Sequence, residues 1–325
     1  MRPPRPVPAR LAARAFSRDE ARSAGITPRM LQHQRFVEIH PSVYRLDDVG
    51  LDDSGRLRAA QLAMPADARV SHASRLRMLG LERGDLTPFH FTVGRDLHLD
   101  IPGITLHRTV LMPAHDGVAV SVEAAYVGYA ATARTIDLIA VGDWLLNRGH
   151  LTVGSLVYFI HAQPWRPGAG QAATVLRHLD GRARSLPESE TRAALVFAGL
   201  PKPEVNRDVR ADDGRFLGCG DLVYLLFKLI VEYEGGQHWT SAVQIVSDVD
   251  RYAGLRRAEW EYVQVTKRHL RSPKSMVRAV HRALAARGYN GPAPAFGPRW
   301  DSLFGQPIPA PTWRTRVGSQ PQMPL

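Results

Sequence analysis

The sequence predicts a mixed fold of the α+β or α/β class, divided into two or three domains. The chain has 325 residues, which exceeds one typical domain, and 44% of them are hydrophobic, which is ample for packed cores. Helix-capping signals recur along the chain, and short apolar runs of strand character lie between them. Near the C-terminus the order is helix, two or three strands, helix, strand, helix. That order predicts a mixed sheet flanked by helices.

The first elements carry the pattern of a winged helix-turn-helix over residues 13–50, preceded by a Pro/Arg-rich segment, residues 1–12, that we expect to be a flexible arm. Ser17 and Glu20 form a capping box, and Thr27 caps a second helix that has proline in its first turn. The expected elements are helices over 18–24 and 28–34 and strands over 36–39 and 43–46. Polar side chains on and after the second helix suit phosphates and base edges: Arg29, Gln32, His33 and Arg35. The alternative is a small helical cap that binds protein or no partner.

Residues 51–165 predict a middle domain of mixed character. Helices are expected at about 57–64, at 71–80 and over an amphipathic segment ending at Gly149, with extended segments at 89–100 and 104–112. The region contains scattered histidines that share no ligand spacing such as i, i+4: His72, His90, His98, His107 and His115. We therefore expect structural or surface histidines here in preference to a metal site.

Charge points to a polyanionic partner. The net charge is +11 and the isoelectric point is about 10.3, so nucleic acid is the natural partner, although charge alone also fits simple solubility. Between Tyr262 and Asn290 the chain has no acid and seven cations, which predict a phosphate-facing surface: Lys267, Arg268, Arg271, Lys274, Arg278, Arg282 and Arg287.

The cysteine content and the hydropathy of the chain indicate the cellular compartment in which we expect the protein. Cys219 is the only cysteine, so the monomer has neither a disulfide framework nor a cysteine-based zinc site, which fits a reducing cytoplasm. The N-terminal segment lacks the apolar run of a secretory signal, and no stretch approaches 18 apolar residues. We expect a cytoplasmic protein without a membrane partner.

The C-terminal region, residues 180–290, predicts a second αβ domain. Ser185 and Glu188 form a capping box that opens a helix to about Ala198. The elements expected after it are strands at 206–210, 215–226 and 228–234, a helix at 242–258, a strand at 261–266 and a helix at 272–288. The remaining residues, 291–325, hold eight prolines and little periodicity, so we expect a disordered tail.

Acidic residues end the most apolar strand, in the stretch KLIVEYEGGQHW at 228–239. Glu232 and Glu234 point to the same face of a strand, and Asp221 on the preceding strand can lie beside them. Three converging carboxylates predict a site for Mg²⁺ or Mn²⁺, with Gln237 and His238 as polar or proton-transfer groups. The alternative for each acid is ordinary: a carboxylate facing solvent, a turn cap at Asp221, or the reciprocal half of the capping box at Glu188.

Three stretches around these residues resemble an actinobacterial Vsr-like, endonuclease-type group of the PD-(D/E)XK superfamily: SLPESETRAALVFAGLPKPEVN, DLVYLLFKLIVEYEGGQHW and SDVDRYAGLRRAEWEYVQVT. The matching residues are Glu188 with Arg192, Asp221, Glu232 with Glu234-Gly235 and His238, Asp248 with Arg251, and Trp260 with Val263 and Thr266. The resemblance covers about residues 182–288 and implies a restriction-endonuclease-like domain that hydrolyses phosphodiesters with Mg²⁺. It departs from the pattern at Glu234, where the superfamily has its lysine and the group has an aspartate before the glycine, and at Glu259, where the group has glycine. His238 or Lys228 could take the place of the lysine.

The N-terminal stretch FSRDEARSAGITPRMLQHQRFVEIHPSVYRL resembles the winged-helix head of AbiEi-type antitoxins. Together the resemblances imply a DNA-associated endonuclease with catalytic residues Glu188, Asp221, Glu232, Glu234, Gln237 and His238, of which Asp221, Glu232 and Glu234 bind the metal. The nucleic-acid contacts expected are Arg29, Gln32, His33, Arg35, Arg251, Lys267, Arg268, Lys274, Arg278 and Arg282. The alternative is a DNA-binding regulator or antitoxin, with a toxin or defence-system partner, whose nuclease-like domain is inactive. A third interpretation is a basic scaffold protein without activity.

Overall fold

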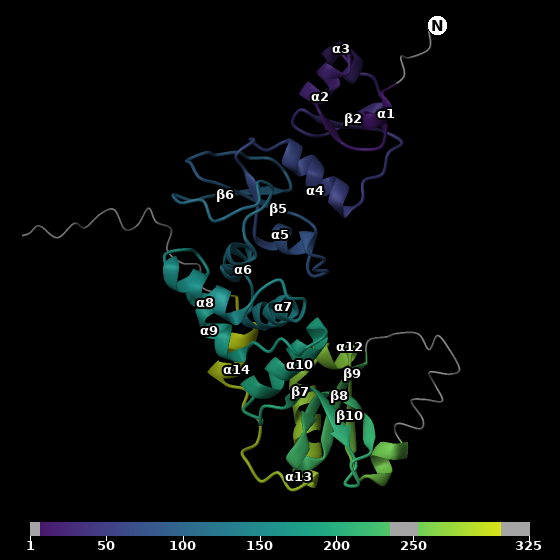
Figure 1. Ribbon diagram of the computed structural model, residues 1–325, viewed down its shortest axis with the longest axis vertical. Helices are drawn as coiled ribbons and strands as arrows, with labels where there is room; N and C mark the ends of the chain where they lie inside the picture. Colours follow the sequence, from purple (N-terminus) through teal and green to yellow (C-terminus); the bar gives the residue numbers. More distant parts are fainter. Residues whose placement is uncertain (1–6, 235–252, 307–325) are drawn as a thin grey trace, which may run out of the picture. The chain divides into compact units, whose positions relative to one another are not determined.

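The computed structural model describes residues 7–234 and 253–306 and divides the chain into two compact units, residues 1–128 and 129–325 (Figure 1). Helices and strands are mixed in both units, and the described strands form three small sheets. The predicted mixed class of fold is therefore confirmed. In the described residues no helix is both long enough and apolar enough to cross a membrane.

The first part of the N-terminal unit contains the two short helices and the hairpin expected from the sequence. Ser17 caps its helix as predicted, because its hydroxyl accepts from the Glu20 N–H while the Glu20 carboxylate accepts from the Ser17 N–H. The elements are α1 (Ala9–Ala12), β1 (Phe16–Ser17), α2 (Arg18–Ser23), α3 (Pro28–Leu31), β2 (Phe36–His40) and β3 (Val43–Leu46). β3 lies between β1 and β2, and both pairings are antiparallel. One expectation was wrong: α1 lies within the predicted flexible arm, and its Leu11 is buried in the core because Phe16 and Phe36 pack around it.

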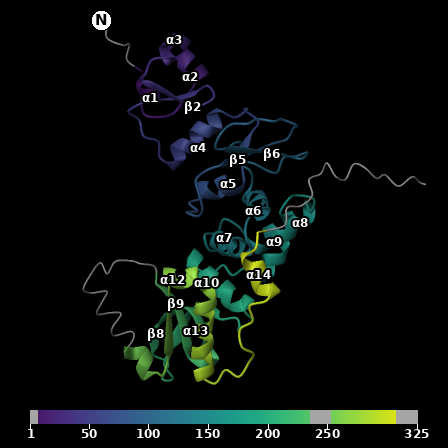
Figure 2. The same ribbon diagram turned by 180° about the vertical axis from the view of Figure 1, so that it is seen from behind.

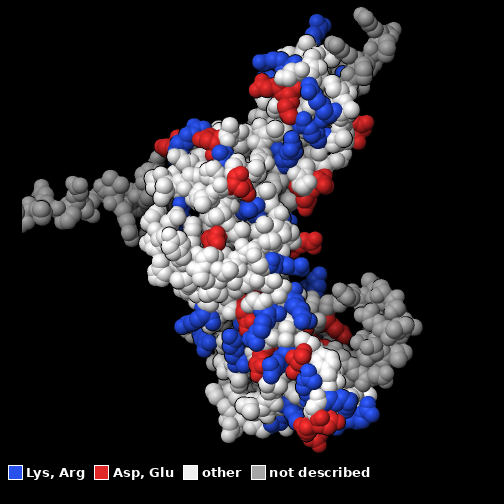
Figure 3. All heavy atoms as spheres, in the orientation of Figure 1, with Lys and Arg blue, Asp and Glu red and all other residues white. Residues whose placement is uncertain are grey.

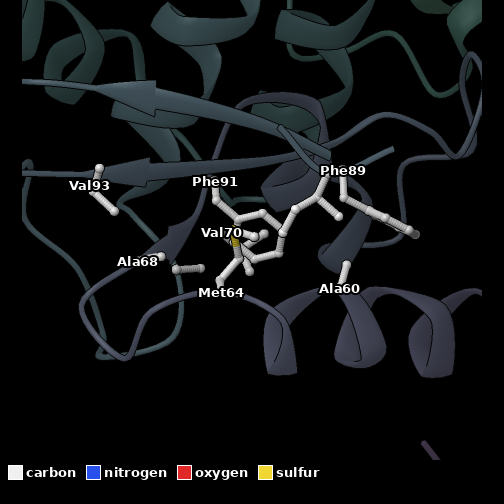
Figure 4. Packing of buried hydrophobic residues seen from close by; sticks show 9 residues of the cluster. Ala60, Met64, Ala68, Val70, Phe89, Phe91 and Val93 are labelled. Carbon is white, nitrogen blue, oxygen red and sulfur yellow. The ribbon is translucent and has the colours of Figure 1, made fainter. Parts of the chain in front are cut away.

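The second part of the N-terminal unit packs a helix on a three-stranded sheet. Its elements are α4 (Asp53–Leu62), β4 (Arg69–Val70), α5 (His72–Met78), β5 (Phe89–Val93) and β6 (Ile104–Arg108). β5 is the central strand, antiparallel to β4 and parallel to β6. Figure 4 shows the core, in which Phe91 and Val70 of the sheet face Met64 and Ala60 at and after α4. Helix α6 (Val122–Ala130) then crosses into the second unit.

The C-terminal unit begins with five helical elements: α7 (Thr135–Asn147), α8 (Val153–Ala162), α9 (Ala169–Val175), the 3₁₀ turn η1 (Leu176–His178) and α10 (Leu186–Phe197). Of these, α7 and α8 lie in the segment that the sequence assigned to a middle domain, and α10 is the helix predicted to open the C-terminal domain. The sequence predicted a domain boundary between residues 165 and 180, whereas the boundary between the two compact units lies between residues 128 and 129. The reason is packing, because α7 lies against α10 and Asp143 of α7 forms a buried ion pair with Arg192 of α10.

The sheet of this unit has four strands in the order β10-β9-β8-β7. Its strands are β7 (Glu204–Arg210), β8 (Phe216–Tyr224), β9 (Leu229–Glu234) and β10 (Glu261–Thr266), with the 3₁₀ turn η2 (Leu225–Phe227) between β8 and β9. The first three form an antiparallel meander, and β10 runs parallel to β9. The helix expected over 242–258 lies mostly outside the described residues, of which 253–257 are helical.

Three helices complete the unit: α12 (Lys267–Arg271), α13 (Pro273–Ala286) and α14 (Pro298–Phe304). Figure 2 shows α13 lying across the sheet, where it contacts β9 and β10. The expected disordered tail is wrong for its first part, because α14 packs against α7 and α10 with Trp300 and Leu303 buried. Proline content misled that expectation, since Pro298 stands in the first turn of the helix, where it is tolerated.

Candidate active site

Two carboxylates, Asp221 of β8 and Glu232 of β9, lie just beyond the last paired residues of these two strands, Leu222 and Val231. Val223 of β8 pairs with Ile230 of β9, and both belong to an apolar cluster with Trp260. Asp221 stands two residues before Val223, and Glu232 stands two residues after Ile230. Glu232 shares the face of Ile230 by alternation. Asp221 meets the end of β9, as the sequence predicted, because its carboxylate accepts from the backbone of Tyr233.

Neighbouring groups hold each carboxylate. The backbone N–H of Tyr233 donates to Asp221 Oδ2 at 2.9 Å, and the Tyr262 hydroxyl donates to Glu232 Oε2 at 3.1 Å. Gln264 of β10 lies opposite Glu232 in the parallel register, so it extends the polar row across a third strand. Asp221 and Glu232 are both partly buried. Fixed carboxylates in a partly desolvated position are typical of a site that binds a cation.

The third predicted ligand, Glu234, is the exposed last residue of β9. It shares the face of Glu232 by alternation, whereas Gln237, His238 and Arg251 lie outside the described residues. Within 7–234 and 253–306 no group of three His, Cys, Asp or Glu side chains is arranged to hold a metal. Mg²⁺ commonly takes one or two protein carboxylates and completes its shell with water and phosphate oxygens. The pair Asp221 and Glu232 fits that requirement, and the three-carboxylate arrangement stays a prediction.

Glu188, expected to support the site, makes contacts that serve the start of α10. Its buried Oε2 accepts from the Arg184 N–H at 3.0 Å and from Asn206 Nδ2 at 2.8 Å. Its own N–H donates to the hydroxyl of Ser185, the N-cap. These contacts tie the helix start to β7, but they do not complete the predicted capping box, because the Glu188 carboxylate accepts from the Arg184 N–H and not from that of the N-cap Ser185. The catalytic role of Glu188 stays a prediction.

Lys228 does not replace the missing lysine of the superfamily pattern. It precedes β9, at the end of the strand opposite to Glu234, and its ammonium group binds Asp212 at 3.2 Å. Four residues of strand separate Lys228 from Glu232, which is about 13 Å at 3.3 Å per residue. His238, the other substitute considered, lies outside the described residues.

The predicted basic surface is largely formed by α12 and α13, which carry no acidic residue. Its exposed cations are Lys267, Arg268, Arg271, Lys274, Arg278 and Arg282. An open cavity of about 420 Å³ between the start of α13 and α14 is lined by Lys274 and Arg278 together with Trp300 and Phe304. Arg287 was wrongly included, because its guanidinium donates to the backbone carbonyls of Phe227 and Glu259. On the face seen in Figure 3, Lys and Arg of this unit are instead interspersed with Asp and Glu.

In the N-terminal unit, the side chains predicted to read DNA are placed as expected for three of the four residues. Arg29, Gln32 and His33 are exposed on and directly after α3. Arg35 is only partly exposed, with its guanidinium 4.7 Å from the centre of the Phe36 ring. The helix therefore presents three polar side chains to solvent, and Arg35 is partly engaged in packing.

Tyr262 is the site residue that sequence reasoning missed. It lies 30 residues after Glu232, and only the parallel pairing of β10 with β9 brings its hydroxyl to the carboxylate. The signal available was its place in an alternating strand, EYVQVT, one position before Val263. That alternation indicates a face and cannot indicate which neighbouring strand it meets.

No protein-family model matches the chain. Two uncharacterised proteins of Mycobacterium tuberculosis, from the strains CDC 1551 / Oshkosh and H37Rv, are each 25% identical to it over 223 residues. Each match covers 65% of this chain and 79% of the relative.

Proposed function

We propose that the protein is a DNA-associated, metal-dependent phosphodiesterase whose active site is built on Asp221 and Glu232. The observation that carries the proposal is the placement of these two carboxylates on adjacent strands, just beyond the last pair of the register, Leu222 with Val231, and next to an apolar cluster. The contacts from Tyr233 and Tyr262 support it, because they orient the carboxylates. The resemblance to Vsr-like endonucleases agrees with these residues.

In this proposal Asp221 and Glu232 hold Mg²⁺ or Mn²⁺, joined by Glu234 from the end of β9. When bound, the ion would lower the pKa of a water molecule and stabilise charge on the phosphodiester. Tyr262 orients Glu232 by donating a hydrogen bond to its Oε2. The cations of α12 and α13 attract the nucleic-acid backbone, and the single cysteine fits action in the cytoplasm.

The test is nicking of supercoiled plasmid by the full-length protein with Mg²⁺. We expect the wild type to nick and the Asp221→Asn variant to lose activity at least about a hundredfold, because removing one charged ligand weakens metal binding. Asp208→Asn is the matched control, since Asp208 is an exposed aspartate on the neighbouring strand β7. Equal nicking by the wild type and Asp221→Asn would refute the assignment.

A second candidate function is supported by the N-terminal unit: DNA-binding regulation of the AbiEi antitoxin kind, with an inactive nuclease-like domain and a toxin or defence-system partner. The supporting observation is that α3 presents Arg29, Gln32 and His33 to solvent beside a three-stranded sheet. We expect operator binding without metal, weakened at least about thirtyfold in the double variant Arg29→Ala/Gln32→Ala, because base-edge contacts contribute about 1–3 kcal/mol each.

The measurement is a gel-shift titration of promoter fragments in EDTA at fixed salt. Arg22→Ala serves as the control, because Arg22 lies on the neighbouring helix α2 with its side chain 72% exposed. Unchanged affinity in the double variant would exclude α3 as the reading helix. Specific binding together with no nicking would favour the regulator over the nuclease.

A further inference from the structure

Three histidines that are far apart in the sequence stack together in the N-terminal unit. His72 begins α5, His90 lies in β5 and His107 lies in β6. The His72 and His107 rings are 3.7 Å apart at 12°, and the His90 and His107 rings are 5.2 Å apart at 19°. All three residues are partly accessible to solvent. The histidine cluster, as we call His72, His90 and His107, therefore joins one helix to two strands.

The hydrogen bond between His90 and His107 allows at most one of these two rings to be charged. His90 Nδ1 lies 3.0 Å from His107 Nε2, and a hydrogen bond between two imidazole nitrogens needs one nitrogen with a proton and one without. His72 Nδ1 lies 2.9 Å from the hydroxyl of Ser71, which in turn accepts from Thr92 Oγ1 at 2.9 Å. Protonating both His90 and His107 removes the acceptor from their hydrogen bond and places two cations side by side.

The His72 ring has no room to move away from that charge. Its backbone is left-handed, with φ at 51°, which is unusual for a residue other than glycine. On one side it meets the His107 ring, and on the other the backbone of α6 at Gly128. A Cβ at position 128 would lie 2.7 Å from the imidazole, so glycine permits this close approach.

Among the described residues, no acid is a cause of the shifted pKa of any histidine in the cluster. Burial, followed for His72 and His107 by the neighbouring imidazoles, lowers the pKa of all three histidines, that of His107 to about 4. Arg75 pairs with Asp116 at 3.6 Å, Arg108 pairs with Asp96, and Arg69 donates to backbone carbonyls of Ala66 and Ala68. The charged or titratable residues on the surrounding elements β4, α5, β6 and α6 of this unit are Arg69, Arg75, Arg77, Arg108, Glu123 and Tyr126.

We propose that the histidine cluster is a proton-sensitive lock, which holds α5 on β5 and β6 while its rings are neutral and releases α5 when acid charges them. The lock is independent of the proposed nuclease. A chain unfolded here titrates its histidines near 6.5, whereas the folded cluster takes up protons at lower pH. The unfolded state therefore binds more protons between these values, and stability is full above about pH 6.5 and falls as the pH drops toward about 4.

Proton binding is favoured over metal binding by the geometry. The rings lie face to face, and within the described part of the chain no three His, Cys, Asp or Glu side chains converge to hold a metal. A zinc site would instead aim three nitrogens at one point about 2.0–2.1 Å from each.

The test uses hydrogen exchange of the full-length protein, read as protection factors of peptides spanning α5, β5 and β6 at pH 7 and pH 5. One histidine whose pKa is 6.5 in the unfolded state and about 4 in the folded state can lower the protection factor by about tenfold for each pH unit of acidification. Three coupled histidines lower it more steeply. We expect a fall of more than about a hundredfold in the wild type and a clearly smaller fall in His107→Gln. His98→Gln is the control, because His98 is an exposed histidine of the same unit with its side chain 68% accessible.

Two outcomes would overturn the lock. One is a His107→Gln protein with the same pH dependence as the wild type. The other is protection that rises on adding Zn²⁺ at pH 7 in the wild type and not in His107→Gln, which would assign the cluster to a metal. If His107→Gln does not fold, NMR titration of the wild-type imidazole protons decides, since ordinary pKa values near 6.5 for all three rings contradict the lock.

Discussion

Replacing Asp143 by alanine is expected to lower the free energy of unfolding of the C-terminal unit by about 3–5 kcal/mol. Asp143 and Arg192 are almost inaccessible, at 0% and 2% side-chain exposure, and Asp143 Oδ2 lies 2.6 Å from the Arg192 guanidinium. Asp143 Oδ1 also accepts from the Asp180 N–H at 2.6 Å. Removing the carboxylate therefore leaves a guanidinium and a backbone donor without their acceptor in the interior.

The size of this effect comes from the charge left behind. Burial raises the pKa of Asp143 although Arg192 opposes that rise, which shows that desolvation of the carboxylate is costly even in the intact pair. Removing one partner leaves the other charge buried without compensation, so the free energy of unfolding falls. Replacing both partners with apolar residues removes the buried charges and their desolvation penalty. The double variant Asp143→Leu/Arg192→Met is thus expected to be much closer to the wild type than either single variant.

Urea unfolding followed by circular dichroism measures these differences. Glu204→Ala is the matched control, because Glu204 and Arg207 form an exposed ion pair at 3.4 Å in the same unit. Its loss should cost less than about 1 kcal/mol. A cost for Asp143→Ala no larger than that for Glu204→Ala would contradict a buried, uncompensated guanidinium as the source of the effect.

Several helix starts and strands were predictable, because helix caps and alternating strands are local signals, whereas α6, α8, α9 and α14 were not predicted. Ser17 and Ser185 mark helix starts, and the strand 261–266 has the predicted ends. The meeting of Asp221 with the end of β9 was predicted from the two adjacent strands and agrees with the hydrogen bond from the Tyr233 N–H to Asp221, whereas the metal site itself stays a prediction.

Contacts between distant segments were not predictable. Asp143 and Arg192 are 49 residues apart, and each reads locally as one polar position in an amphipathic helix. The histidine cluster lacks ligand spacing because the parallel pairing of β5 with β6 and the left-handed backbone at His72 bring the rings together. The unit boundary at 128/129 was missed because α7 belongs to its neighbour α10 through packing that no linker composition indicates.

Replacing Trp300 by alanine is the second change with a large expected effect, about 3–5 kcal/mol of destabilisation. Trp300 is 3% exposed, although it lies in a segment whose proline content suggested disorder. Its ring contacts Phe296 edge-on with centroids 4.9 Å apart and Phe304 at 5.0 Å. Truncation removes these contacts and leaves a cavity between α14 and the helices it covers, so transfer and cavity costs add.

The segment before α14 is also tied to the unit by its backbone, because the Ala295 N–H donates to the carbonyl of Ala198 at 2.9 Å. Trp165→Ala is the matched control: the same residue type in the same unit, but 56% exposed, so its loss should cost less than about 1 kcal/mol. Thermal and urea unfolding of both variants test the difference. If the two variants lose the same free energy of unfolding, α14 does not belong to the folded core. If only Trp300→Ala is strongly destabilised, residues 298–304 are part of the domain that positions Asp221 and Glu232.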